Sequence, residues 1–238
     1  MKGIYLAGGY PDRPTFKKCA QAVARCGFDF IEIGIPFNDP IADGPVIARA
    51  LYASISGGTT PEQVIEDIRD LDGLKIRKYA MTYANIVYSR GIRSFSEDLK
   101  GSLDGVIIPD LPNRMARMFC DQGLEVPIVP FATLETRQPD IELMNASKSG
   151  IIYFVGVRGI TGSASNFSSP ELAEKAALLK KHSSKKIIIG FGIKTAEDAR
   201  QAMEIGDGFV VGTEAVRRQE DPEELEKYLR SLSGTLYA

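Results

Sequence analysis

The sequence has little of what metal centres and disulfide-bonded folds require. It contains one histidine, His182, in the lysine-rich run KKHSSKK, and three cysteines, Cys19, Cys26 and Cys120, without a CxxC pair. Protein metal sites are built mainly from clusters of such residues, so the sequence predicts no metal ion. An odd number of cysteines without paired spacing is typical of a reducing compartment, which indicates a cytoplasmic protein.

The chain also lacks a basic excess and a long apolar run. Its lysines and arginines number 29 against 31 acids, which gives a formal net charge of -2. A protein that neutralises nucleic-acid phosphates normally has the opposite balance. No apolar run approaches the roughly 20 residues that span a bilayer, and glycine and proline interrupt the opening MKGIYLAGGYPDR too early for a signal peptide. We therefore expect neither nucleic acid nor a membrane as partner.

What the sequence does contain is a regular alternation of two patterns. Short apolar, β-branched runs of the kind that form fully buried parallel strands recur along the chain. Amphipathic stretches with helix start and stop signals lie between them; Thr60 with Gln63 matches a capping box, and Gly27 ends the first stretch. The eight strand candidates are residues 3–7, 30–34, 78–83, 105–109, 126–131, 151–156, 186–192 and 208–212.

Eight strands alternating with helices predict a (β/α)8 barrel, with residues 1–238 as a single domain. A doubly wound open sheet is the alternative, but it usually has fewer strands, and no GxGxxG motif follows the first strand candidate. Active sites of barrels lie at the carboxyl ends of the strands, where the following loops meet. Candidate functional residues are therefore those that end a strand candidate or follow it.

The segment IEIGIPFNDPIADGP, residues 31–45, places a glutamate near such a strand end. Strand alternation puts Glu32 on the face opposite Ile31 and Ile33, so that it points into the barrel lumen near the rim. Loss of water there raises the pKa of a carboxyl group towards neutrality, which suits proton transfer. The alternative is a structural ion pair with a lysine or arginine inside the lumen.

Two aspartates, Asp39 and Asp43, follow on a loop that three prolines stiffen. A stiff loop over the barrel mouth holds a carboxylate in one position, as catalysis requires. The alternative for each aspartate is a turn or N-cap residue, because the next helix is expected to begin near Pro45.

Glycines end the last two strand candidates, Gly192 in GFGIKTAED and Gly212 in VVGTEAV. Glycine lets backbone N–H groups approach an anion, and the loops after strands seven and eight are the usual phosphate site of barrels. A third loop, residues 156–169, is rich in glycine and serine and could close over a ligand. Plain turn glycines are the alternative, although three such loops together favour phosphate.

The motif E-x-G-x-P-F-x-D-P-x-A-D-G-P, which runs from Glu32 to Pro45, resembles the signature of the tryptophan synthase α subunit family. Further stretches follow in that family's order, so that the resemblance covers nearly the whole chain. They are MTYANIVYSRG at 81–91, PDLP at 109–112, GITG at 159–162, GFGI at 190–193 and VVGT at 210–213.

The resemblance implies a barrel lyase that splits indole-3-glycerol phosphate into indole and D-glyceraldehyde 3-phosphate. It also implies a PLP-dependent β subunit as partner in an α2β2 heterotetramer, and no cofactor in this chain. It assigns general acid and base catalysis to Glu32, and to Asp43 the role of holding the indole N–H and stabilising the cationic ring.

The remaining roles that the resemblance implies fall into three groups. Phosphate binding is assigned to Gly162, Phe191, Gly192, Gly212 and Thr213, the indole pocket to Tyr5, Met81, Tyr83, Tyr153 and Thr161, and the partner interface to Pro36, Asp39 and Asn85. The apolar and aromatic members of these groups could equally be core residues.

Some features leave alternatives. Relatives in this family usually have a helix before the first strand, whereas the first strand candidate here begins at residue 3. Rival functions are a phosphate-binding isomerase, a lyase that releases indole without a partner, and a non-catalytic activator of a β subunit that binds sugar phosphate. PIADGP at 40–45 argues against the isomerase, and the presence of both Glu32 and Asp43 argues against the activator.

Overall fold

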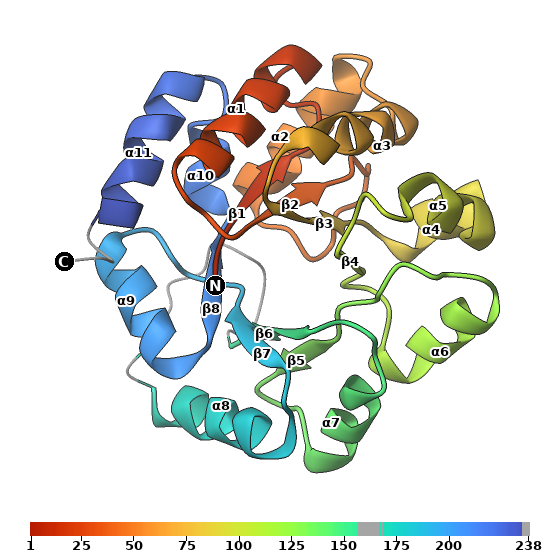
Figure 1. Ribbon diagram of the computed structural model, residues 1–238, viewed down its shortest axis with the longest axis vertical. Coiled ribbons are helices and arrows are strands. Elements are labelled where there is room, and N and C mark those ends of the chain that lie inside the picture. Colours follow the sequence, from red (N-terminus) through yellow and green to blue (C-terminus); the bar gives the residue numbers. More distant parts are fainter. Residues whose placement is uncertain (157–166, 168, 235–238) are drawn as a thin grey trace.

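The computed structural model describes residues 1–156, 167 and 169–234. Eight parallel strands form one sheet in the order β4-β3-β2-β1-β8-β7-β6-β5, curled around an axis with the helices outside (Figure 1). The strands are β1 (Lys2–Ala7), β2 (Phe30–Gly34), β3 (Arg77–Met81), β4 (Gly105–Ile107), β5 (Phe131–Thr133), β6 (Ile151–Val155), β7 (Lys186–Ile189) and β8 (Gly208–Val211). First and last strands pair with each other, and a bridge between Val106 and Ile128 joins β4 to the segment before β5, which confirms the predicted barrel against the open sheet.

The fifth strand lies later in the chain than predicted, because β5 begins where the predicted range 126–131 ends. Pro127 and Pro130 have no N–H group to donate to a strand ladder. The segment before β5 still binds β4: Val106 donates its N–H to the Pro127 carbonyl, and Val129 donates to the Val106 carbonyl, both at 2.8 Å. These two bonds join the halves of the sheet and close the barrel.

Helices cover the outer face of the sheet, and none of those described is long and apolar enough to cross a membrane. Thr60 and Gln63 form the predicted capping box, and Gly27 takes a φ of 74° after the first helix ends. The helices are α1 (Arg13–Arg25), α2 (Pro45–Ser56), α3 (Pro61–Asp70), α4 (Ala84–Arg90), α5 (Ile92–Leu99), α6 (Asn113–Asp121), α7 (Gln138–Asn145), α8 (Pro170–His182), α9 (Ala196–Ile205), α10 (Thr213–Arg217) and α11 (Pro222–Gly234), with a 3-10 turn η1 (Leu71–Gly73).

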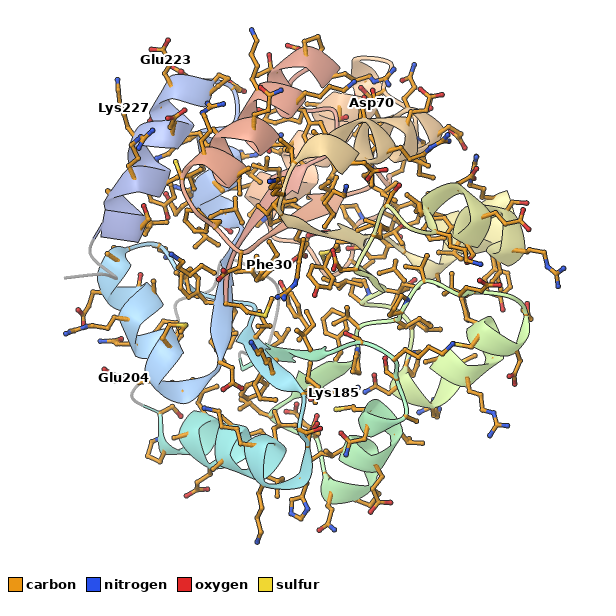
Figure 2. The ribbon with its side chains drawn as sticks, viewed as in Figure 1. Phe30, Asp70, Lys185, Glu204, Glu223 and Lys227 are labelled. Carbon is orange, nitrogen blue, oxygen red and sulfur yellow. The ribbon has the colours of Figure 1, made fainter. Side chains whose placement is uncertain are left out.

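The lumen is filled near its amino-terminal end by an aromatic pair. The Phe30 ring meets the Tyr79 ring edge-on, with centroids 5.5 Å apart, and Figure 2 shows Phe30 close to the centre of the barrel. A Cβ atom on Gly3 would lie 2.0 Å from the Phe30 ring, so this strand position requires glycine. Side chains of the strands therefore fill the amino-terminal end of the lumen. The expected site lies at the other end, where the carboxyl ends of the strands meet.

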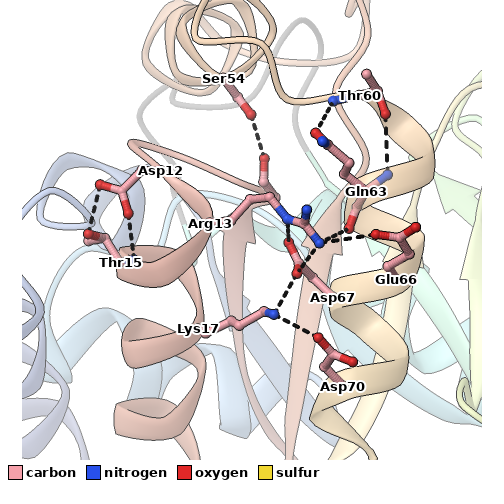
Figure 3. A network of polar contacts seen from close by, with 11 residues as sticks. Asp12, Arg13, Thr15, Lys17, Ser54, Thr60, Gln63, Glu66, Asp67 and Asp70 are labelled. Atoms are coloured by element: carbon pink, nitrogen blue, oxygen red, sulfur yellow. Dashed lines mark hydrogen bonds and ion pairs between the residues drawn. The ribbon is translucent and has the colours of Figure 1, made fainter.

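A buried aspartate fastens α1 to α3 (Figure 3). Asp67 of α3 is fully buried and accepts two hydrogen bonds of 2.9 Å from Arg13, one on each carboxylate oxygen, while Lys17 Nζ lies 2.8 Å from its Oδ1. Arg13 and Lys17 stand one turn apart on α1, so both reach the same carboxylate. Since α1 and α3 follow β1 and β2, this contact fixes the outer layer beside the two strands that carry Tyr5 and Glu32.

We expect Asp67→Ala to lower the free energy of unfolding by about 2 kcal/mol, because two cations lose their shared partner. The loss stays at the low end for a buried pair, since Arg13 and Lys17 are partly exposed and water can replace the carboxylate. Urea denaturation measures the difference. Asp70→Ala is the control, because Asp70 is exposed and its only ion pair with a described residue is the one with Lys17. Equal midpoints for the two variants would contradict the importance of the buried contact.

Candidate active site

A cavity of about 200 Å³ opens at the carboxyl ends of the strands. The structure brings together nine of the residues predicted for the site from separate stretches of sequence. The predicted residues that line the cavity are Tyr5, Glu32, Asp43, Met81, Tyr153, Phe191, Gly192, Gly212 and Thr213. Tyr83 lies behind Asp43, and Gly162 and Thr161 lie outside the described residues.

Glu32 is fully buried and faces the cavity from β2, while Ile31 and Ile33 pack under the helices as predicted. Neither of its carboxylate oxygens has a hydrogen-bond partner among the described residues. Burial and the neighbouring Asp43 raise the pKa of Glu32 to about 8, and the Tyr153 hydroxyl offsets part of this rise although it lies outside full hydrogen-bond geometry. The alternative of a structural ion pair inside the lumen is therefore wrong.

Two glycines make room for the tyrosines beside Glu32. A Cβ atom on Gly34 would lie 2.0 Å from the Tyr5 hydroxyl, and one on Gly190 would lie 1.9 Å from the Tyr153 ring. Glycine is the one amino acid type without a Cβ atom, so at these two positions it leaves space for both rings to lie across the lumen next to the carboxyl group. Burial raises the pKa of both tyrosines well above its ordinary value, with the carboxyls of Glu32 and Asp43 adding to the effect.

Asp43 faces the same cavity from the loop after β2. It is buried, and burial raises its pKa to about 6, with a hydrogen bond from Tyr83 opposing the rise. Gly44, not Asp43, occupies the N-cap position of α2. The structure therefore decides between the two interpretations of this aspartate in favour of the cavity.

Tyr83 holds the loop that carries Asp43. Its hydroxyl donates to Asp43 Oδ2 at 2.7 Å and accepts the backbone N–H of Ala42 at 3.1 Å. Its ring stacks on Phe37, with centroids 4.9 Å apart. Sequence reasoning placed Tyr83 in the indole pocket, whereas the structure shows that it positions Asp43, a role that no local pattern encodes.

The glycine loops after β7 and β8 line the same cavity as Glu32 and Asp43. Gly192 adopts a φ of 72°, a conformation that favours glycine, and the ring of the preceding Phe191 stacks on Phe167. Gly212 stands at the N-cap of α10, which begins with Thr213. The two loops thus present backbone to the cavity, as the phosphate prediction requires.

The residues predicted for a partner interface lie on two adjoining segments. Asp39 and Asn85 are exposed, whereas Pro36 is buried. The Phe37–Tyr83 stack joins these segments, so their exposed residues belong to one neighbourhood of the surface. The interface itself stays a prediction.

Sequence reasoning missed several residues that line the cavity, including Ile47, Thr133, Val210 and Lys194. The apolar ones carry no signal, since they resemble every other core residue. Lys194 does carry a signal in the sequence, because it follows Gly192 by two positions on the loop predicted to bind phosphate. Among the described residues, no group of three or more histidine, cysteine, aspartate or glutamate side chains is arranged to hold a metal ion.

The fold, and two buried carboxyl groups at the carboxyl ends of its strands, define an enzyme of the (β/α)8-barrel class with acid–base groups in its mouth. The sequence model of the family described as tryptophan synthase alpha chain matches residues 4–235. The chain belongs to the tryptophan synthase alpha chain family, and with it to the lyases of tryptophan biosynthesis. The predicted resemblance is confirmed.

Relatives and solved structures agree. The tryptophan synthase alpha chain of Thermotoga petrophila is 32% identical over 226 residues, which cover 93% of this chain and 92% of that one. That of Deinococcus radiodurans is 34% identical over 219 residues, covering 88% and 78%. The structure of Mycobacterium tuberculosis tryptophan synthase superposes with a TM-score of 0.90 at 26% identity, over 100% of this chain and 92% of that chain. Tryptophan synthase subunit alpha from Legionella pneumophila gives 0.87 at 26%, over 100% and 92%.

We expect Tyr83→Phe to raise the pKa of Asp43 above its value of about 6, because the ionised carboxylate loses the hydroxyl that stabilises it. Carbon-13 NMR titration of labelled aspartate carboxyl groups measures the shift. Tyr79→Phe is the matched control, since Tyr79 packs on Phe30 near the far end of the lumen. An unchanged Asp43 titration in Tyr83→Phe would show that the hydrogen bond does not control this group.

Proposed function

We propose that the chain cleaves indole-3-glycerol phosphate to indole and D-glyceraldehyde 3-phosphate by a retro-aldol step. The observation that carries the proposal is the pair of buried carboxyl groups, whose pKa values of about 8 and about 6 separate their protonation states at neutral pH. Two titratable groups pushed apart in this way are the usual sign of an acid with an ionised companion.

Near pH 7 Glu32 keeps its proton and Asp43 is ionised. Glu32 gives its proton to the ring carbon that bears the glycerol chain, which leaves a positive charge on the indole nitrogen. Asp43 accepts the N–H hydrogen bond and stabilises that charge. The Glu32 carboxylate then takes the proton of the adjacent glycerol hydroxyl, the carbon–carbon bond breaks, and its electrons return to the ring. Glu32 ends as it began, protonated.

The rest of the cavity matches the two ends of this substrate. Apolar side chains, among them Met81, Ile47 and Val210, suit a bicyclic aromatic ring. The backbone at Gly192, Gly212 and Thr213 suits a phosphate, which main-chain N–H groups bind well when no side chain intervenes. The substrate would therefore lie with its ring between the carboxyl groups and its charged tail at the last two loops.

A β subunit is part of the proposal, with a cytoplasmic α2β2 heterotetramer as the assembly. The Mycobacterium tuberculosis neighbour is described as tryptophan synthase, and that superposition supports a partner for this chain. Asp39, Asn85 and the strongly exposed Ile41 would contribute to the contact. We expect PLP in the β subunit and no cofactor in this chain.

The decisive experiment is an indole-release assay on wild type, Glu32→Gln and Asp43→Asn, with and without an added β subunit. We expect turnover by the wild type, stimulated by the β subunit. Loss of the acid in Glu32→Gln should lower kcat by about 10² to 10⁴-fold, and loss of the anion in Asp43→Asn by about 10²-fold. Full turnover by Glu32→Gln at saturating substrate would contradict the mechanism. An inactive wild type would identify a non-catalytic activator.

The same assay should give a bell-shaped dependence of kcat/KM on pH. Activity rises as Asp43 ionises near pH 6 and falls as Glu32 loses its proton near pH 8. The two apparent values belong to the coupled pair. A profile that stays flat between pH 5 and 9 would contradict these roles.

Stability provides an independent prediction. The folded-state pKa of Glu32, about 8, lies above the ordinary value of 4.5, so between these values the folded protein binds more protons than the unfolded chain. The contribution of Glu32 to the free energy of unfolding therefore falls as pH rises from about 4.5 to 8. We expect Glu32→Gln to need more urea for unfolding than the wild type at pH 8, with a smaller difference at pH 5. Exposed Glu142→Gln is the control; a Glu32→Gln variant that keeps the wild-type slope would contradict the raised pKa.

A further inference from the structure

Lys194 is the only positively charged side chain among the described residues that line the cavity. It lies on the loop between β7 and α9, two residues after Gly192, and its side chain is exposed. The acidic side chains among the described residues of the lining are those of Glu32 and Asp43. Lys194 therefore sets the charge of the side of the mouth that holds the glycine loops.

The backbone of Lys194 is held on both sides. Its N–H donates to Asp198 Oδ2 at 2.9 Å, and its carbonyl accepts the Tyr228 hydroxyl at 2.9 Å. Tyr228 belongs to α11, and the Arg218 guanidinium lies over its ring at 4.3 Å. Residues of two helices, α9 and α11, thus fix the backbone from which the Lys194 side chain extends. The position of the ammonium group varies only through the side-chain torsions.

Acidic neighbours on α9 are occupied by other groups. Asp198 caps the helix through the backbone N–H groups of Lys194 and Thr195, and Glu197 pairs with Arg200. Lys194 itself forms no ion pair with a described residue. Its charge therefore remains available for a ligand in the cavity.

We propose that Lys194 is a specificity-determining residue that recognises the phosphate dianion of the substrate through its ammonium group. This inference rests on the proposed function and adds a side-chain cation to the backbone groups of the two loops. A dianion that enters a cavity with an ionised Asp43 is repelled by it, and a lysine on the loop after β7 in the same cavity compensates for that repulsion. The group is exposed, so its effect is moderate and screened by salt.

The test compares Lys194→Met, Lys194→Arg and the wild type. We expect KM for indole-3-glycerol phosphate to rise about tenfold in Lys194→Met, while kcat stays within about twofold of the wild-type value. In Lys194→Arg we expect the wild-type KM, because arginine keeps the positive charge. Lys181→Met, which removes an exposed lysine of α8, is the control and should leave KM unchanged. Titration calorimetry with glycerol 3-phosphate measures tail binding without turnover, and its salt dependence should weaken in Lys194→Met.

The outcomes separate the two proposals. Weaker glycerol 3-phosphate binding by Lys194→Met supports the lysine even if the wild type releases no indole, a result that would defeat only the proposed reaction. An active wild type whose KM and glycerol 3-phosphate affinity are unchanged in Lys194→Met overturns the inference and leaves the reaction standing. Equal losses in the methionine and arginine variants, or a wild type that binds no glycerol 3-phosphate, also overturn it.

Discussion

The chemistry of this protein depends on a carboxyl group that is kept away from water without a cation beside it. Strand alternation turns Glu32 into the lumen, and hydrogen-bonded neighbours on both sides, β1 and β3, fix its backbone. An ionised carboxylate is costly in such a place, so the group retains its proton to a pH of about 8. Asp43, on the loop after β2 in the same cavity, differs because one tyrosine hydroxyl stabilises its charge.

Asp67 shows the opposite solution to the same problem. It is as fully buried as Glu32, but Arg13 and Lys17 surround it with charge-assisted bonds. One buried acid therefore fastens helices together on the outside of the barrel, and the other is left unpaired inside it. The difference lies in which element faces each side chain: a polar helix face in one case, and tyrosines, glycines and aliphatic residues in the other.

The mouth of the barrel is divided into two chemical halves. Strand β2 and its loop contribute the two acids, whereas the loops after β7 and β8 contribute backbone and the Lys194 cation. The second half depends on a distant part of the chain, since Tyr228 of α11 holds the Lys194 carbonyl, while the nearby Asp198 holds its N–H. A substrate with an aromatic end and an anionic end fits this division, because each end meets the half that suits it.

By itself the sequence determined the barrel, the capping box at Thr60 and the inward direction of Glu32, because these follow from strand period, helix period and local backbone chemistry. Only the tertiary structure decided that Asp43 faces the cavity and is not a cap, that Tyr83 positions it, and that Lys194 lines the mouth. It also moved β5 beyond the proline-containing segment predicted for it. Such features depend on which groups burial brings together from distant parts of the chain, and neither spacing nor composition records those encounters.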